Sequence, residues 1–156
     1  MMSRAIVFLF AFLGLFASSL VHAAPVKELS ARQIGDLQCN ADRLTIVGAL
    51  ATMQGTLSEL ASSASSDPAT AAGVQSVQSD VTDAQQAIGT IAKALFTGQT
   101  APASARDQVK SALLSANSTL SGLTSTDATV SSLLQKATSE LKVAGAAGEG
   151  VVANCN

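Results

Sequence analysis

Apolar residues recur every three or four positions over residues 74–95, and most positions between them are polar. The successive spacings are three, four, three, four, three and four, which places these side chains on one narrow face of a single helix. The members are Val74, Val77, Val81, Ala84, Ile88, Ile91 and Leu95. Such a helix is not stable alone in water, so the pattern predicts partner helices elsewhere in the chain.

Three further segments show the same periodicity and supply the partners. Their apolar rows are Ile46, Leu50, Met53, Leu57 and Leu60; Val109, Leu113, Ala116, Leu120 and Leu123; and Val130, Leu134, Ala137, Leu141 and Ala144. No stretch of useful length alternates apolar and polar residues, so the chain is predicted to be all-α. The residues expected to face the core are Val77, Val81, Ile88, Ile91, Leu50, Leu57, Leu113, Leu120, Leu134 and Leu141.

Capping residues indicate where these helices begin and end. Asp67 followed by Pro68 is typical of a helix start, because Asp accepts hydrogen bonds from free amides and proline has a helical φ. Thr97 and Gly98 are the expected end of that central helix. The other boundaries are expected at Asp36 or Asn40 to about Ser62 for the first helix, at Pro102 or Ser104 for the third, and at Thr126 or Asp127 for the fourth.

Two details of these boundaries are predictions in their own right. Ser104 with Asp107 three residues later resembles a capping box at the start of the third helix. Gly145, Gly148 and Gly150 fall within six residues, so a continuous helix is uncertain beyond Val143 because glycine disfavours helix.

The connections between the predicted helices are short, which makes sequential helices antiparallel neighbours. In an up-down-up-down bundle, the start of the first helix and the end of the fourth lie at the same end. Cys39 and Cys155 occupy these two places. We therefore predict an antiparallel up-down four-helix bundle closed by one disulfide; unpaired thiols or intermolecular bridges are the alternative.

The first residues have the pattern of a secretory signal. Arg4 supplies a positive start, residues 5–20 form an apolar run, and small residues precede the expected cleavage after Ala23 or Ala24. A membrane anchor is the alternative, but the run is short for a bilayer-spanning helix of about 20 residues. The predicted organisation is a signal peptide at 1–23, a flexible lead at 24–35 and a helical bundle domain at 36–156.

Removal of the signal leaves little catalytic chemistry. The only histidine, His22, is lost with it, which excludes Ser-His and Cys-His nucleophiles. Asp80 and Asp83 share a helical face and resemble a carboxylate pair, but a solvated face explains them better. We predict no catalytic residue, no metal site, no cofactor and no enzymatic activity.

Eight basic residues remain against eleven acidic residues, with Phe96 as the one remaining aromatic, so nucleic-acid binding is not expected.

Asn117 and Phe96 are candidates for special roles. Asn117-Ser118-Thr119 is an N-glycosylation sequon, although its place beside the apolar-row residue Ala116 could bury it. Phe96 is expected to close one end of the core, and the alternative is the rim of an apolar pocket. The small residues of the apolar rows would either leave room for a lipid or pack tightly and leave none.

Several segments resemble small secreted proteins of mushroom-forming fungi, called effector-like because they are short, secreted and lack catalytic motifs. The segments are DLQCN followed two residues later by Arg43 and Leu44, LFTGQTAPASARDQV, STDATV and the terminal VVANCN. The layout is more distantly similar to the fungal hydrophobic surface binding and cell wall galactomannoprotein group. Those proteins are Ser/Thr/Ala-rich helical bundles that associate with apolar surfaces, lipids or the wall. The resemblance identifies no functional residue.

These observations favour a secreted, non-catalytic protein that binds an unidentified extracellular partner as an effector-like or signalling factor. The alternative is a carrier or surface-active module for lipids or apolar surfaces, and a cell wall mannoprotein is the third possibility. The ligand-binding residues are not predicted. No second long apolar run follows the signal, so we expect a mature chain without a transmembrane segment, released or associated with the wall.

Overall fold

The computed structural model describes residues 37–155. The predicted signal peptide and lead lie outside the described residues. Within 37–155 the chain forms helices and no strands, which confirms the all-α prediction for this part. The helices are α2 (Leu37–Ser63), α3 (Pro68–Phe96), α4 (Ala103–Gly122) and α5 (Ala128–Asn154).

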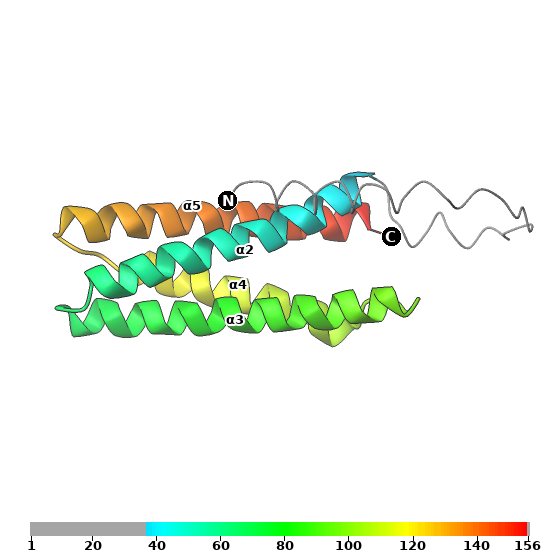
Figure 1. Ribbon diagram of the computed structural model, residues 1–156, viewed down its shortest axis with the longest axis horizontal. Helices are drawn as coiled ribbons and strands as arrows, with labels where there is room; N and C mark the ends of the chain where they lie inside the picture. The colour runs from blue at the N-terminus through cyan, green and yellow to red at the C-terminus, as the bar shows by residue number, and fades with distance from the viewer. Residues whose placement is uncertain (1–36, 156) are drawn as a thin grey trace, which may run out of the picture.

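The helices associate as two closely packed pairs (Figure 1). α2 packs extensively against α5, and α3 packs extensively against α4, whereas α2 with α3 and α4 with α5 make far fewer contacts. The beginning of α2 and the end of α5 lie at the same end of the structure. There a disulfide joins Cys39 and Cys155, which confirms the predicted pairing.

Buried side chains from all four helices form one core. Seven of the ten residues predicted to face the core are buried, and Ile88, Ile91 and Leu113 are partly buried against it. Many buried positions outside α2 are alanines: Ala84, Ala87, Ala94, Ala105, Ala112, Ala116, Ala137, Ala144 and Ala147. Because small side chains allow helix axes to approach closely, these alanines account for the tight packing within each pair.

Asp67 caps α3 as predicted. Its carboxylate accepts hydrogen bonds from the backbone amides of Ala69, at 3.1 Å, and Thr70, at 3.2 Å. The Thr70 hydroxyl donates a third bond at 2.6 Å. The side-chain and backbone hydrogen bonds from Thr70 lower the pKa of Asp67 below its ordinary value. Asp67 thus holds the first turn of α3 in place, and Pro68 supplies its first helical residue.

The predicted end of α3 at Thr97 and Gly98 is also confirmed. Gly98 has a φ of 72°, a left-handed conformation that glycine adopts without a steric penalty. The Gly98 amide donates to the Leu95 carbonyl at 3.0 Å, and the Gln99 amide donates to the Ala94 carbonyl at 2.9 Å. This pair of bonds defines a Schellman motif, which satisfies carbonyl groups that the helix end would leave free.

Two predictions at the ends of helices are wrong. α4 begins at Ala103 with Pro102 in the cap position and no side-chain cap bond, so the capping box of Ser104 and Asp107 does not form. Ser104 already lies inside the first turn, where its side chain cannot occupy the N-cap. Phe96 is 90% exposed and does not close the core. It stands two residues, about 200° of helical rotation, from the buried Ala94.

α5 continues without interruption through its three glycines to Asn154. Ala144 and Ala147 are buried in this stretch. A Cβ atom built on Gly148 would lie 3.6 Å from Ile46 Cδ1 of α2. Packing against α2 therefore stabilises the end of α5 and outweighs the low helix propensity of glycine.

Candidate functional site

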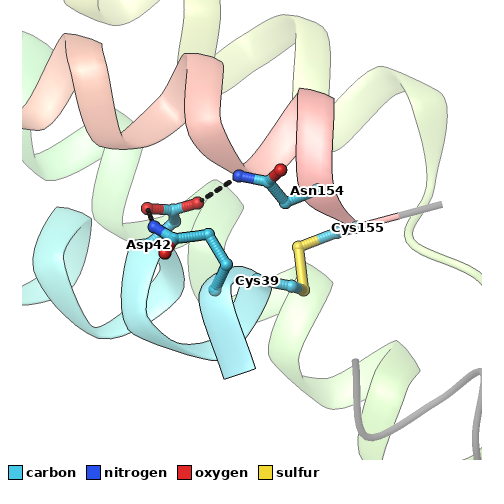
Figure 2. Close-up of a disulfide and its surroundings, with 5 residues drawn as sticks. Cys39, Asp42, Asn154 and Cys155 are labelled. Carbon is cyan, nitrogen blue, oxygen red and sulfur yellow. Dashed lines mark hydrogen bonds between the residues drawn. A yellow bond between two sulfur atoms is a disulfide. The ribbon is translucent and has the colours of Figure 1, made fainter. Parts of the chain in front are cut away.

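The disulfide end combines the covalent link with a small polar cluster (Figure 2). The Cα atoms of Cys39 and Cys155 are 5.1 Å apart, and Cys39 is fully buried. Asp42 accepts a 2.9 Å hydrogen bond from Gln38 Nε2 and another 2.9 Å bond from Asn154 Nδ2 of α5. This end is a structural clasp between α2 and α5, because its polar groups bond to one another.

Gly150 makes room for that clasp. A Cβ atom at position 150 would lie 2.6 Å from Asp42 Oδ2 and 2.7 Å from its Cγ. Both distances are shorter than a van der Waals contact, so a side chain here would displace the Asp42 carboxylate. The glycine therefore permits the bond between Asp42 and Asn154.

Two carboxylates of the described residues each have an oxygen atom that is buried in the bundle. Thr56, which is 2% exposed, donates a 3.0 Å hydrogen bond to Glu140 Oε1 across the α2–α5 contact. Within residues 37–155, Glu140 Oε2 and Asp80 Oδ2 are buried without a hydrogen-bond partner. Asp83 is exposed, as expected for a solvated face, whereas Asp80 on the same face is only partly exposed. Among the described residues, no group of three or more Cys, His, Asp and Glu could hold a metal ion.

A groove of about 560 Å³ follows the seam between α4 and α5. Its apolar residues are Leu120, Leu123 and Leu134, of which the first and third are buried core residues. Hydroxyl and amide groups of α5 form the other wall, at Ser131, Gln135, Thr138 and Ser139. An apolar floor beside a polar wall suits a molecule that is itself part apolar and part polar.

Lys142 connects this groove to a second hollow of about 160 Å³. The second hollow lies further along the same seam and is lined by Leu113, Leu114, Asn117, Leu141 and Gly145 besides Lys142. Lys142 is the one charged residue among the lining residues of both hollows. A ligand along the seam would therefore meet a single positive charge near its middle.

The Leu123 side chain packs against a glycine of α3. A Cβ atom at Gly73 would lie 2.5 Å from Leu123 Cδ2, so the absence of a side chain at Gly73 lets Leu123 pack there. Leu123 directly follows α4 and lines the larger hollow. Gly73, near the start of α3, thus shapes the floor of the groove.

The periodicity analysis identified the leucines of this seam except Leu114, and it did not identify the polar wall. Ser131, Gln135, Thr138 and Lys142 repeat at four, three and four residues along α5, beside the apolar row that contains Leu134 and Leu141. That second row is the signal that could have identified the wall.

Asn117 is exposed on α4 and borders the smaller hollow. Ser118 is exposed as well, whereas Ala116 is fully buried. The burial that was expected to impede glycan transfer is therefore not present at the asparagine itself. Glycosylation of Asn117 stays a prediction, and its side chain is placed where a glycan would extend into solvent.

No protein family matches this chain. Neither the curated proteins nor the solved structures include a significant match to it. Among the helices of residues 37–155, none is both long enough and apolar enough to cross a bilayer.

Proposed function

We propose that this chain is a secreted, non-catalytic protein that acts by binding outside the cell, as an effector-like or regulatory factor. The groove between α4 and α5 carries the binding part of this proposal. It offers a leucine floor, a hydroxyl-rich wall and Lys142. The disulfide between Cys39 and Cys155 supports secretion, because thiols stay reduced in the cytosol.

The character of the groove limits the ligand class. Its floor favours an apolar body, its wall favours hydrogen-bonding groups, and Lys142 favours a negative group. A ligand that satisfies all three is an amphiphile with an acidic or phosphorylated head, or a partner helix with an apolar stripe and an acidic residue. The groove is open to solvent along the seam, so a ligand would bind without a large rearrangement of the bundle.

The test is to purify the protein from native secretions and analyse it by mass spectrometry under non-denaturing conditions. Recovery of an unliganded protein, together with changed cell behaviour when its gene is deleted, supports the binding-factor proposal. Ser139→Trp, which places a large ring at the groove wall, should abolish the effect of the protein on cell behaviour. Ser132→Trp is the matched control, because Ser132 is exposed on α5 and is not a lining residue. Equal activity of the two variants would exclude the groove.

A lipid or apolar-molecule carrier is the second candidate, and the core leucines in the groove floor favour it. The same mass spectrometry would then show a stoichiometric lipid with the wild-type protein. Lys142→Glu should lower the amount of an anionic lipid, whereas Lys110→Glu, at an exposed position of α4 away from the groove, should not. A cell wall mannoprotein is the third candidate, supported by the exposed Asn117, and covalent wall attachment would establish it.

We also infer an up-down-up-down order for the helices. The connections between successive helices are short, and the start of α2 and the end of α5 meet at the disulfide. Both observations support antiparallel neighbours. This order exposes one side of the α4–α5 seam along its length, as the proposed binding groove requires.

A further inference from the structure

α2 has a second apolar face that points away from the bundle. Its members are Leu37, Ala41, Leu44, Gly48, Ala51 and Gly55, and the row continues through Ser58 and Ser62. The spacings alternate between four and three residues over the whole helix, which is the repeat of a coiled-coil seam. We call these eight residues the outer α2 face. Every one of them is exposed.

The outer face is unusual because its leucines are almost free of contacts. Leu37 is 83% exposed and Leu44 is 74% exposed. Among the described residues, nothing lies within 4 Å of a Cβ atom built on Gly48 or Gly55. The close approach that these glycines permit is therefore not used by any described part of this chain.

The face is complementary to itself when two copies of α2 run antiparallel. With Gly48 of one chain opposite Ala51 of the other, Leu44 stands opposite Gly55. In the same register Ala41 faces Ser58 and Leu37 faces Ser62. Each leucine thus meets a glycine or serine, and the two-fold axis repeats every contact, as a symmetric dimer interface requires.

The charges beside the face agree with this register. The outer α2 face holds no charged residue. Glu59, which flanks it, lies near Gln38 of the second copy in the antiparallel register. The two Glu59 carboxylates are then separated by roughly 28 Å, the rise of about 19 helical residues, so no like charges meet.

The area of contact determines how strong the dimer is expected to be. Each copy would contribute the eight face residues and about as many flanking residues. At the usual ratio of ~800 Å² for 20–30 residues, this contact would bury roughly 500 Å² per chain and about 1,000 Å² in total. That area is at the lower bound for a specific interface, so a weak, reversible dimer is expected.

We propose that the protein forms a two-fold homodimer through antiparallel packing of its outer α2 faces. The dimer leaves the proposed binding groove accessible, because α4 packs against α3 and α5 and not against α2. Asn117, on α4, is likewise outside the interface. Two grooves would then be presented by one assembly, which would strengthen binding to a surface or a repeated target.

The first test is sedimentation equilibrium of the disulfide-bonded protein from about 1 µM to 1 mM. A reversible monomer–dimer equilibrium is expected. Leu44→Glu should raise the dissociation constant about 100-fold or more, because two leucines per dimer are lost and each is worth about tenfold. Gly55→Leu, which fills the position opposite Leu44, should weaken the dimer similarly. Phe96→Glu is the control, since Phe96 is 90% exposed on α3 and should leave association unchanged.

The second test establishes the register. Protein carrying Ala41→Cys is mixed with protein carrying Ser58→Cys and oxidised under mild conditions. The antiparallel register predicts crosslinks between the two variants and few within either one. Crosslinks confined to Ser58→Cys with itself would refute the register, because they require parallel helices. A protein that stays monomeric at 1 mM, as expected if residues before Leu37 or another segment cover the face, would refute the proposal.

Discussion

Removal of the disulfide should cost a large part of the stability of this bundle. Cys39 and Cys155 are separated by 116 residues, so the link closes a loop that contains nearly the whole described part of the chain. Chain-entropy reasoning assigns a loop of this length an entropy of about 16 cal/mol/K, which is about 5 kcal/mol at 25 °C. Whole domains of this size are commonly stable by only about 5–15 kcal/mol. The double variant Cys39→Ala and Cys155→Ala should therefore lose at least about a third of the unfolding free energy.

The assay is equilibrium unfolding in urea, followed by helical circular dichroism. Wild type is measured with and without reductant, and the double variant is measured alongside. Reduced wild type keeps both sulfur atoms, so it isolates the loss of the link. The double variant adds the loss of the fully buried Cys39 sulfur, so it should be the less stable of the two. The dependence of the unfolding free energy on urea should also steepen, because the unlinked unfolded chain exposes more surface.

A loss below about 1 kcal/mol in both reduced wild type and the double variant would refute the reasoning. It would mean that the ends of α2 and α5 stay together in the unfolded chain without the link. The loss of unfolding free energy could instead be as large as expected while its dependence on urea stays unchanged. That result would place the effect in the folded state, at the clasp of Asp42 and Asn154.

Three further predictions test the packing and the caps, and two of them include a control substitution. Leu57→Ala should lower the unfolding free energy by about 2–5 kcal/mol, because Leu57 is fully buried, whereas urea unfolding of Phe96→Ala should match wild type, because Phe96 is 90% exposed. Asp67→Ala should destabilise α3, and thermal scans across pH should show its deficit. The lowered pKa of Asp67 makes that deficit full above the ordinary value near 3.8 and smaller as pH falls through the folded value. Gly145→Ala, with nothing near its Cβ, should stabilise by up to about 1 kcal/mol, whereas Gly150→Ala should not, because it displaces Asp42; an equal gain would contradict the clasp.

Helix boundaries were predictable where one local residue type determines them. Asp67 and Gly98 are such cases, since a capping carboxylate and a left-handed glycine act within a few residues of themselves. The disulfide was predictable for a different reason: short connections fix which helix ends meet. The caps depend only on residues nearby in the sequence, and the disulfide depends only on the order of the helices.

The predictions were incomplete where contacts between helices decide the outcome. Helix continues past Val143 because α2 packs against the glycine-containing end of α5. Ile88 and Ile91 are only partly buried, since α3 contacts α4 far more than α2 and alanines occupy that closer contact. The groove could not be predicted either, because it depends on how far α4 and α5 stand apart. Periodicity specifies a face of each helix but not the distance to its neighbour.

The arrangement in two helix pairs leaves α4 and α5 as the most weakly packed neighbours. α2 and α5 are held by the disulfide, by the bond between Asp42 and Asn154 and by the bond between Thr56 and Glu140. α4 and α5 share the fewest contacts of the adjacent helix pairs. A ligand that separates α4 from α5 therefore disrupts little existing packing, whereas separation of α2 from α5 breaks a covalent bond. Under the proposed function, a ligand would therefore reach the core leucines Leu120 and Leu134 at the α4–α5 seam and not at the clasped seam between α2 and α5.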